Sequence, residues 1–435
     1  MAWKSPKMHL IRKGFDGLDI SYPLTISEEL ADKMRLGRAV SEANNGEVGM
    51  VEHNGVRMQV AATGARGGYA FRCDSGVAPF GENWFFKQPN GKADKWGVRV
   101  SCRALPLAFD GLAKTRARLE DTLARLELDY VPGTESIGRV DVAFDILAPD
   151  LAPDRLHFVA HARSRVQEIS DTLVQVVGRS GRVESITIGK NPNRQVVLYD
   201  KRAEVIATRK PYWWRVWNDA LAAQGLPPLD PRNRDTSTVW RVEIRAFKRH
   251  LKDDWAVTTW GNLRDNLSPI LQLALGEVRY TVPTADTNRA RWPVHPLWAL
   301  IAAAAVGDME DLASMVDRSS IDALLTAERD EMLQKQIAGC SLSRAALNGV
   351  PIELLDVYAL GNMHQIIREW QRNPDWTQDR LAQARAKYGV GEERRGEPEE
   401  VGGPERTLVR GAANGKFEPR LKDAANCSSG SFAPS

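Results

Sequence analysis

The chain has 435 residues, 43% of them hydrophobic and 26% charged, which is the composition of a globular protein with room for two or three domains. The net charge of only +3 identifies no partner, although residues 186–252 hold fourteen Lys and Arg against six Asp and Glu, a balance typical of either a polyanion-binding surface or a solvated basic face. Four cysteines without paired spacing argue against a disulfide framework and a zinc cluster. The apolar runs are well short of the roughly 20 residues of a membrane span, so a cytoplasmic protein is expected.

The first predicted lobe, residues 1–135, combines strands with a closing helix. Alternation of apolar and polar residues predicts the strands, and Asn54-Gly55 predicts a tight hairpin because both turn positions need positive φ. Leucines at helical spacing then predict a helix that ends near Glu127. The strands predicted in this lobe span residues 15–22, 48–53, 56–62, 69–73 and 96–102.

The second predicted lobe, residues 136–280, has the same mixture. Apolar residues between Leu156 and Val177 predict a long amphipathic helix that stops at Gly178, and a Trp-rich segment after residue 210 predicts another helix. The predicted strands span residues 139–145, 184–189, 195–201 and 240–246. Because Leu18–Tyr22 and Val140–Phe144 share an acid inside an apolar alternation, the two lobes are candidates for a duplication, although five residues make a short repeat.

From residue 281 the predicted strands give way to helices. The region 281–390 is predicted to be all-α, and residues 391–435 are predicted to form a disordered tail because they hold few apolar residues. The predicted helices span residues 296–306, 308–316, 319–336, 354–373 and 379–388. The fold class that follows is α+β, with two related lobes of mainly antiparallel sheet packed with helices, then the helical region and the tail.

Three strand carboxylates lie in the sequence near the basic segment. Asp141, Asp145 and Glu243 each stand on the polar side of a predicted strand, where a carboxylate usually does no more than face water. Oxygen ligands of this kind also suit Mg²⁺ or Mn²⁺, which bridge carboxylates to phosphates. Four residues of strand separate the two aspartates by roughly 13 Å. One ion therefore fits one aspartate, preferably Asp141, together with Glu243.

Tyr199 follows an apolar strand beside a basic loop. A strand tyrosine is most often a packed aromatic; for nucleophilic work its phenol, with an unperturbed pKa of about 10, needs a nearby cation such as Lys201 or a metal ion. Lys190 and Arg194 of the loop are placed to hold flanking phosphates. The aromatic residues from Tyr212 to Trp217 offer base-stacking faces, but helical spacing favours a core role for them.

Three segments, "RVDVAFD", "ITIGKNPNRQVVLYDKRAE" and "VWRVEIRAFKRHL", occur in the order and spacing found in replication initiation factors. Over roughly residues 14–280 the chain resembles the Rep_trans-type family of rolling-circle initiators and conjugative relaxases. The resemblance implies that Tyr199 nicks one strand of origin DNA and becomes joined to the 5′ phosphate. It also implies that acidic residues, Asp141, Asp145 and Glu243, hold Mg²⁺ or Mn²⁺ in place of the His-hydrophobic-His pair of other rolling-circle enzymes.

Basic residues complete the predicted site. Lys201 and Arg241 are expected to stabilise charge in the reaction as catalytic residues. The predicted DNA-binding residues are Lys190, Arg194, Arg202, Arg245 and Lys248. The expected partner is origin DNA, single-stranded or as an extruded hairpin, and the C-terminal helices are candidates for contacting a host helicase or forming a homodimer.

Two other functions stay open at this point. A non-catalytic origin-binding protein with the same fold is the alternative, and it is disfavoured because Tyr199 and all three acids are present. A helical tyrosine recombinase, which works without metal through Arg and His clusters, is disfavoured by the strand setting of Tyr199. Cleavage and its metal requirement separate these hypotheses.

Overall fold

The computed structural model describes residues 8–43, 48–76, 79–89, 96–160, 174–179, 182–189, 193–306 and 318–388. Within these residues the main feature is an antiparallel sheet of 11 strands in the order β2-β3-β4-β5-β6-β1-β7-β12-β11-β10-β9, and a small pair, β8 and β13, lies apart from it. The α+β class predicted from the sequence is confirmed. None of the described helices combines the length and the apolarity that crossing a membrane requires.

The strands span β1 His9–Tyr22, β2 Gly49–His53, β3 Val56–Val60, β4 Phe71–Asp74, β5 Glu82–Phe86, β6 Val98–Cys102, β7 Ser136–Leu147, β8 Phe158–Ala160, β9 Val174–Arg179, β10 Arg182–Gly189, β11 Arg194–Asp200, β12 Val239–Phe247 and β13 Val278–Tyr280. The α-helices span α1 Glu28–Glu42, α2 Ala104–Arg125, α3 Lys201–Ala207, α4 Tyr212–Ala223, α5 Arg234–Ser237, α6 Lys248–Asp253, α7 Trp260–Glu277, α8 Pro296–Ala304, α9 Arg318–Leu347, α10 Leu355–Arg372 and α11 Pro374–Tyr388.

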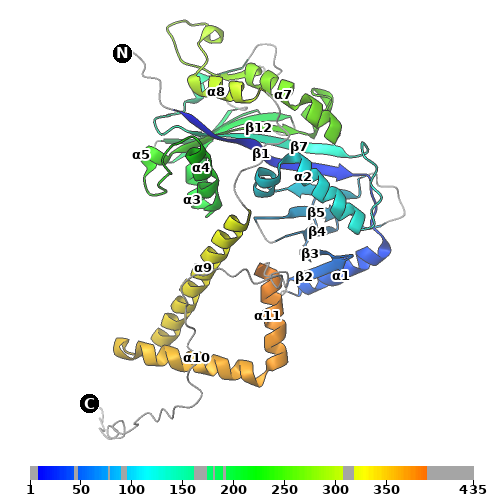
Figure 1. Ribbon diagram of the computed structural model, residues 1–435, viewed down its shortest axis with the longest axis vertical. Helices are drawn as coiled ribbons and strands as arrows, with labels where there is room; N and C mark the ends of the chain where they lie inside the picture. Colours follow the sequence, from blue (N-terminus) through cyan, green and yellow to red (C-terminus); the bar gives the residue numbers. More distant parts are fainter. Residues whose placement is uncertain are drawn as a thin grey trace, which may run out of the picture. The chain divides into compact units, whose positions relative to one another are not determined.

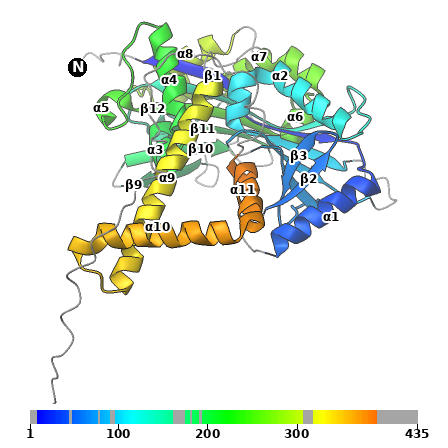
Figure 2. The ribbon, with the colours of Figure 1, turned by 60° about the horizontal axis from the view of Figure 1, so that its bottom comes forward.

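The two halves of the sheet follow one path. In the first half the opening strand β1 pairs with the last strand β6, and β5 to β2 follow outward; in the second half β7 pairs with β12, and β11 to β9 follow outward (Figure 2). The central strands β1 and β7 are antiparallel, and Leu18 of the repeated motif pairs with Val140 of its counterpart. Because this pairing is antiparallel, a local twofold axis relates Leu18 to Val140, and the strand order runs outward in the same way in both halves.

The irregularities of the central strands obey the same symmetry. In β1 the pairing with β7 skips Asp16, between Phe15 and Gly17; in β7 it skips Gly138, which stands at the symmetry-related position. A β-bulge redirects the side chain of the extra residue. Because only Asp16 of the two bulged residues has a carboxylate, this bulge gives the first half a group that its counterpart lacks.

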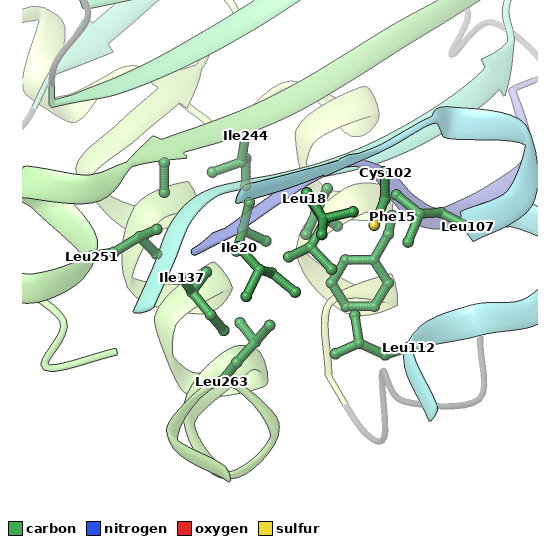
Figure 3. Packing of buried hydrophobic residues seen from close by; sticks show 14 of the residues in the cluster. Phe15, Leu18, Ile20, Cys102, Leu107, Leu112, Ile137, Ile244, Leu251 and Leu263 are labelled. Atoms are coloured by element: carbon green, nitrogen blue, oxygen red, sulfur yellow. The ribbon is translucent and has the colours of Figure 1, made fainter. Parts of the chain in front are cut away.

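The two faces of the sheet differ in what they bury. On one face the apolar residues of β1, β7 and β12 pack against α2, α6 and α7 in the main core; Figure 3 shows Leu18, Ile20 and Ile244 pointing toward Leu112 and Leu263 of the helices. On the opposite face α4 lies over the C-terminal half of the sheet (Figure 1), and a second apolar cluster joins it to the start of α9. Charged residues lie on this second face, so the site residues share one side of the sheet.

The structure corrects several sequence predictions. The helix predicted from Leu156 to Gly178 is replaced by β8 and β9 at its two ends, whereas residues 161–173 lie outside the described part of the chain. In β9 the side chains of residues 175–178 are exposed, so the apolar spacing there does not mark a buried helix face. The sequence patterns also did not predict α1, β5 and α7. The predicted helix 308–316 and the tail 391–435 lie outside the described residues.

Candidate active site

Three neighbouring strands bring the predicted residues together. Tyr199 of β11 pairs with Arg241 of β12, which in turn pairs with Asp145 of β7. Directly paired residues of an antiparallel sheet project from the same face. Glu243 lies two residues further along β12 and projects from the same face. Asp141 pairs with Arg245, two residues beyond Glu243, and projects from that face as well. The sheet register alone therefore gathers one phenol, one guanidinium and three carboxylates.

Tyr199 and Glu243 are in direct contact. The Tyr199 hydroxyl donates a hydrogen bond of 2.6 Å to Glu243 Oε1, and the tyrosine side chain is partly exposed. Burial raises the pKa of Tyr199 well above 10, and although the charge of Arg241 opposes this shift, the Glu243 carboxylate adds to it. The phenol is therefore protonated at neutral pH, and the group placed to take its proton is Glu243.

Arg241 is fully buried and bound by two carboxylates. Its Nε and Nη2 donate to the two oxygens of Asp145 at 2.5 and 2.8 Å, and Nη1 donates to Asp16 Oδ1 at 2.6 Å. The indole nitrogen of Trp217 donates to Asp145 Oδ2 at 2.9 Å. Burial alone would raise the pKa of Asp145, but Arg241 outweighs it, and the pKa is lowered. Asp145 is thus an ionised partner of Arg241.

Asp16 is a site residue that sequence reasoning missed. Its carboxylate lies 2.6 Å from Arg241 Nη1, and although burial opposes ionisation, the charges of Arg241 and Lys201 hold its pKa far below the usual value. Asp16 reaches this position from the bulge in β1. The available signal was the pair Asp16-Gly17, which precedes the regular alternation of Leu18, Ile20 and Tyr22.

Asp141 has a different environment from Asp145. Arg139 donates to both of its oxygens, at 3.0 and 2.6 Å, yet burial dominates, and with the nearby charge of Glu243 it raises the pKa of Asp141 to about 6. Gly17 on β1 makes room for this carboxylate, because a Cβ there would lie 2.9 Å from Asp141 Oδ2. The charge of the Asp141 carboxylate therefore changes close to neutral pH, whereas Asp145 stays ionised.

Lys201 lies next to the site but is already paired. It is the first residue of α3, where Asp200 caps the helix by accepting from the Ala203 amide at 2.8 Å, so it does not end the strand as predicted. Its ammonium is buried, pairs with Glu204 at 2.7 Å and lies 5.6 Å from the centre of the Tyr199 ring. Burial and the charge of Arg241 lower its pKa.

The predicted DNA-binding residues are placed unequally. Arg194 is buried and pairs with Glu277 at 2.7 Å, so the structure does not support it as a backbone contact. Arg245 binds Glu243 Oε2 at 2.5 Å, and Arg202 donates to the Pro231 carbonyl. Lys248 is exposed, with its ammonium 5.1 Å from the centre of the Trp96 ring. Lys190 lies outside the described residues.

The Trp-rich helix α4 covers the buried part of the site. Trp213 and Trp217 are 1% and 0% exposed, and Tyr212 is also buried, so the core role that helical spacing favours is confirmed over base stacking. The Trp213 ring lies 4.5 Å from the Arg241 guanidinium carbon and 4.8 Å from that of Arg12. A ring face stabilises a desolvated guanidinium, so α4 helps to hold both arginines in the interior.

The three predicted metal ligands do not form one ligand set. Asp145 has both oxygens occupied by Arg241 and Trp217, and no group of three His, Cys, Asp or Glu side chains with metal-site geometry occurs in the described residues. Asp141 and Glu243 remain a pair of neighbouring carboxylates, each on its own strand. Two carboxylates with substrate phosphate oxygens and water suffice for Mg²⁺. The oxygens of Asp141 and Glu243 are also hydrogen-bonded, but their arginine partners, Arg139 and Arg245, are 37% and 29% exposed and can move aside, whereas Arg241 is fully buried against Asp145. Of the three acids, Asp141 and Glu243 therefore fit a divalent cation better than Asp145.

Comparison with known proteins gives distant similarities. No protein-family model matches the chain. An uncharacterized protein, ORF430 of Pseudomonas phage Pf1, is 29% identical over 208 residues, which is 46% of this chain and 46% of the phage protein. The similarity thus spans about half the length of that relative. The structure of a rolling circle replication initiator protein from Geobacillus stearothermophilus aligns with a TM-score of 0.34 at 15% identity, over 69% of this chain and 97% of the other.

Proposed function

We propose that this protein initiates replication by nicking and rejoining one strand of an origin DNA through a covalent 5′-phosphotyrosine. The observation that carries the proposal is the contact between the Tyr199 hydroxyl and Glu243, at 2.6 Å, on a sheet face where Arg241 and Arg245 supply positive charge. Covalent catalysis typically uses a hydroxyl as nucleophile, a neighbouring base that accepts its proton, and a third group that orients the base. Here Arg245 orients the base, since it binds the other oxygen of Glu243.

The proposed reaction is an in-line displacement at phosphorus. Tyr199 Oη forms a bond to the phosphorus while its proton passes to Glu243 Oε1, and the bond from phosphorus to the 3′ oxygen breaks. The 3′ oxygen takes a proton from water and leaves as a free hydroxyl, and the 5′ phosphate stays on the tyrosine. Because one phosphodiester replaces another, the reverse reaction rejoins the strand. Arg241 lies 3.9 Å from Glu243 Oε1 and contributes a fixed positive charge beside the nucleophile.

A divalent cation is a second part of the proposal. Asp141 and Glu243 would hold Mg²⁺ or Mn²⁺, which when bound neutralises negative charge on the scissile phosphate. The Asp141 carboxylate is available for this only when ionised, that is, above a pH of about 6. Asp145 is left out, since its partners are Arg241 and Trp217.

The experiment uses the full chain and a labelled single-stranded oligonucleotide that carries an inverted repeat found beside the gene. With Mg²⁺ or Mn²⁺, wild-type protein should form an adduct that survives denaturing electrophoresis, and Tyr199→Phe should form none. Tyr130→Phe is the matched control, because the Tyr130 hydroxyl also donates 2.6 Å to a glutamate, Glu135, on another part of the fold. An adduct with Tyr199→Phe contradicts the proposal. Specific binding without cleavage in any metal supports the non-catalytic alternative.

The C-terminal helices are proposed to carry protein contacts. In α10 one set of apolar side chains at three- and four-residue spacing is exposed to solvent: Val357, Leu360, Met363, Ile367 and Trp370. Exposed apolar side chains in such a row are typical of helix-to-helix association. A host helicase and a second copy of this chain both stay proposals for this region.

A further inference from the structure

The first half of the sheet has a position equivalent to the proposed active site. The twofold relation places Leu18 on Val140, so that Ser21 of β1 corresponds to Ala143 of β7. Arg99, which pairs with Ser21, therefore stands where Glu243 stands in the second half, since Glu243 pairs with Ala143. By the same register Lys87 stands at the place of Tyr199, because its amide donates to Gly97, the counterpart of Arg241.

The residues at this equivalent position reverse the charge of the active site. An arginine replaces the base, and a lysine replaces the nucleophile, so the chemistry of the second half is excluded. Beside them lie two aromatic rings: Phe85, which takes the place of Val197, and Tyr69. The equivalent position thus lies on the same face of the sheet but is cationic and aromatic.

The geometry of this cluster is that of a stacked platform. The Arg99 guanidinium carbon lies 4.1 Å from the Phe85 ring centre and 5.1 Å from that of Tyr69, and the Lys87 ammonium lies 5.2 Å from the Tyr69 ring centre. Both rings are 8% exposed, whereas Arg99 is more exposed than the rings below it. Arg99 thus forms the outer layer of the stack.

Arg99 has no counter-charge among the described residues. No carboxylate within the described part of the chain lies at ion-pair distance from it, and its Nε is a buried donor with no hydrogen-bond acceptor. Arg72, which is exposed, pairs with Phe85 from the neighbouring strand β4. A planar guanidinium held flat over aromatic rings, beside another cation, matches a phosphate with an adjacent unpaired base.

We propose that this cluster (Arg72, Lys87 and Arg99 over Tyr69 and Phe85) is a second, non-cleaving binding site for single-stranded DNA. A base stacks on the outer face of the Arg99 guanidinium, and Arg99 and Arg72 bind the phosphates on either side of it. The proposal rests on the proposed function, since it assumes that the strand nicked at Tyr199 is the ligand. Charge complementarity selects a polyanion, and the stacked platform selects unpaired bases over a duplex.

The test measures binding of the full chain to a fluorescein-labelled 20-nucleotide oligothymidylate by anisotropy, across a range of salt concentrations. Arg99→Ala should weaken binding by about ten-fold, the loss expected for one stacked base. It should also reduce the salt dependence by roughly 0.7 in the slope of log K against log salt, as for one lost phosphate contact. Arg99→Lys should keep the wild-type salt dependence but not the wild-type affinity. The lysine ammonium has the positive charge of arginine but lacks the planar group on which a base can stack.

The matched control is Arg57→Ala. Arg57 projects from the same sheet face, but it is exposed and pairs with Glu52 at 3.1 Å, so its loss should change the affinity by less than about two-fold. Thermal melting of each variant confirms that the fold is intact. An unchanged affinity for Arg99→Ala, or an equal loss for Arg57→Ala, overturns the inference.

Failure of the inference and failure of the nicking function give different results. Tyr199→Phe should bind the oligothymidylate as wild type does, and Arg99→Ala should still form the covalent adduct when the origin oligonucleotide is in excess. Adduct formation together with an unaffected Arg99→Ala affinity refutes the second site alone. If Arg99→Ala weakens oligothymidylate binding and Arg57→Ala does not, but the wild-type protein forms no adduct, the nicking function alone is refuted.

Discussion

The two interpretations of Asp145, metal ligand or buried partner of Arg241, predict different behaviour of Asp145→Asn. The substitution keeps the size of the side chain but removes its charge. In asparagine one of the two carboxylate oxygens becomes an amide nitrogen, which donates and cannot accept. In one orientation this nitrogen faces Arg241 Nε, and in the other it faces Arg241 Nη2 and the Trp217 indole, which now donate to Oδ2. Either way at least one hydrogen bond is lost. Arg241, fully buried, would keep Asp16 as its only carboxylate at hydrogen-bond distance.

The magnitude follows from the burial of the pair. Arg241 and Asp145 are both 0% exposed at their side chains. Removing one partner of such a pair destabilises a protein by about 3–5 kcal/mol, because it leaves a charge without its compensation in a medium of low dielectric constant. In a chain of this size that lowers the melting midpoint by roughly 5 °C. The loss should be the same with and without divalent metal.

Urea unfolding in EDTA, followed by tryptophan fluorescence, measures this directly. Asp121→Asn is the control for the chemistry of the change, because Asp121 pairs with Arg125 on the exposed surface of α2 and should lose less than about 1 kcal/mol. A loss below about 1 kcal/mol for Asp145→Asn in EDTA would refute the structural role. A defect that appears only in the metal dependence of DNA cleavage would return Asp145 to the ligand set.

The remaining predictions concern Asp141. Folding raises the pKa of this carboxyl from 3.8 to about 6, so the folded state binds the proton more tightly than the unfolded state. The contribution of Asp141 to the free energy of unfolding therefore falls as pH rises from about 4 to above 6, by up to roughly 3 kcal/mol. The difference between wild type and Asp141→Asn, measured by urea unfolding from pH 4 to 7, should show this slope; parallel curves would contradict it. Gly17→Ala should displace the Asp141 carboxylate, because the new Cβ would lie 2.9 Å from Asp141 Oδ2. Metal-dependent adduct formation should then fall several-fold, whereas the free energy of unfolding should change by less than about 1 kcal/mol. Unchanged activity in this variant would show that the carboxylate position is unimportant for cleavage.

Sequence patterns predicted the strands that carry the site but not its internal contacts. Alternating residues fix which side chains share a face, so β1, β7, β11 and β12 could be located, and with them Tyr199, Asp141 and Glu243. Pairing between strands decides which of these touch, and this depends on register and bulges that no local pattern records. Asp145 and Asp141 look alike in the sequence, yet Arg241 pairs with one and Arg139 with the other. Asp16 was missed for the same reason.

The bulge at Asp16 also explains why the two lobes act as one unit. β1 belongs to the first lobe in the sequence but lies between β6 and β7, so the site at the centre of the sheet draws residues from both lobes. Arg12 and Asp16 contribute one positive and one negative charge to the group around Arg241, within a buried environment that tolerates no unmatched charge. If β1 were absent, Arg241 would lose Asp16, and β7 would lose its longest strand pairing. The first lobe therefore supplies part of the charge balance around Arg241 in the second lobe, and this helps to keep the neighbours of Tyr199 in place.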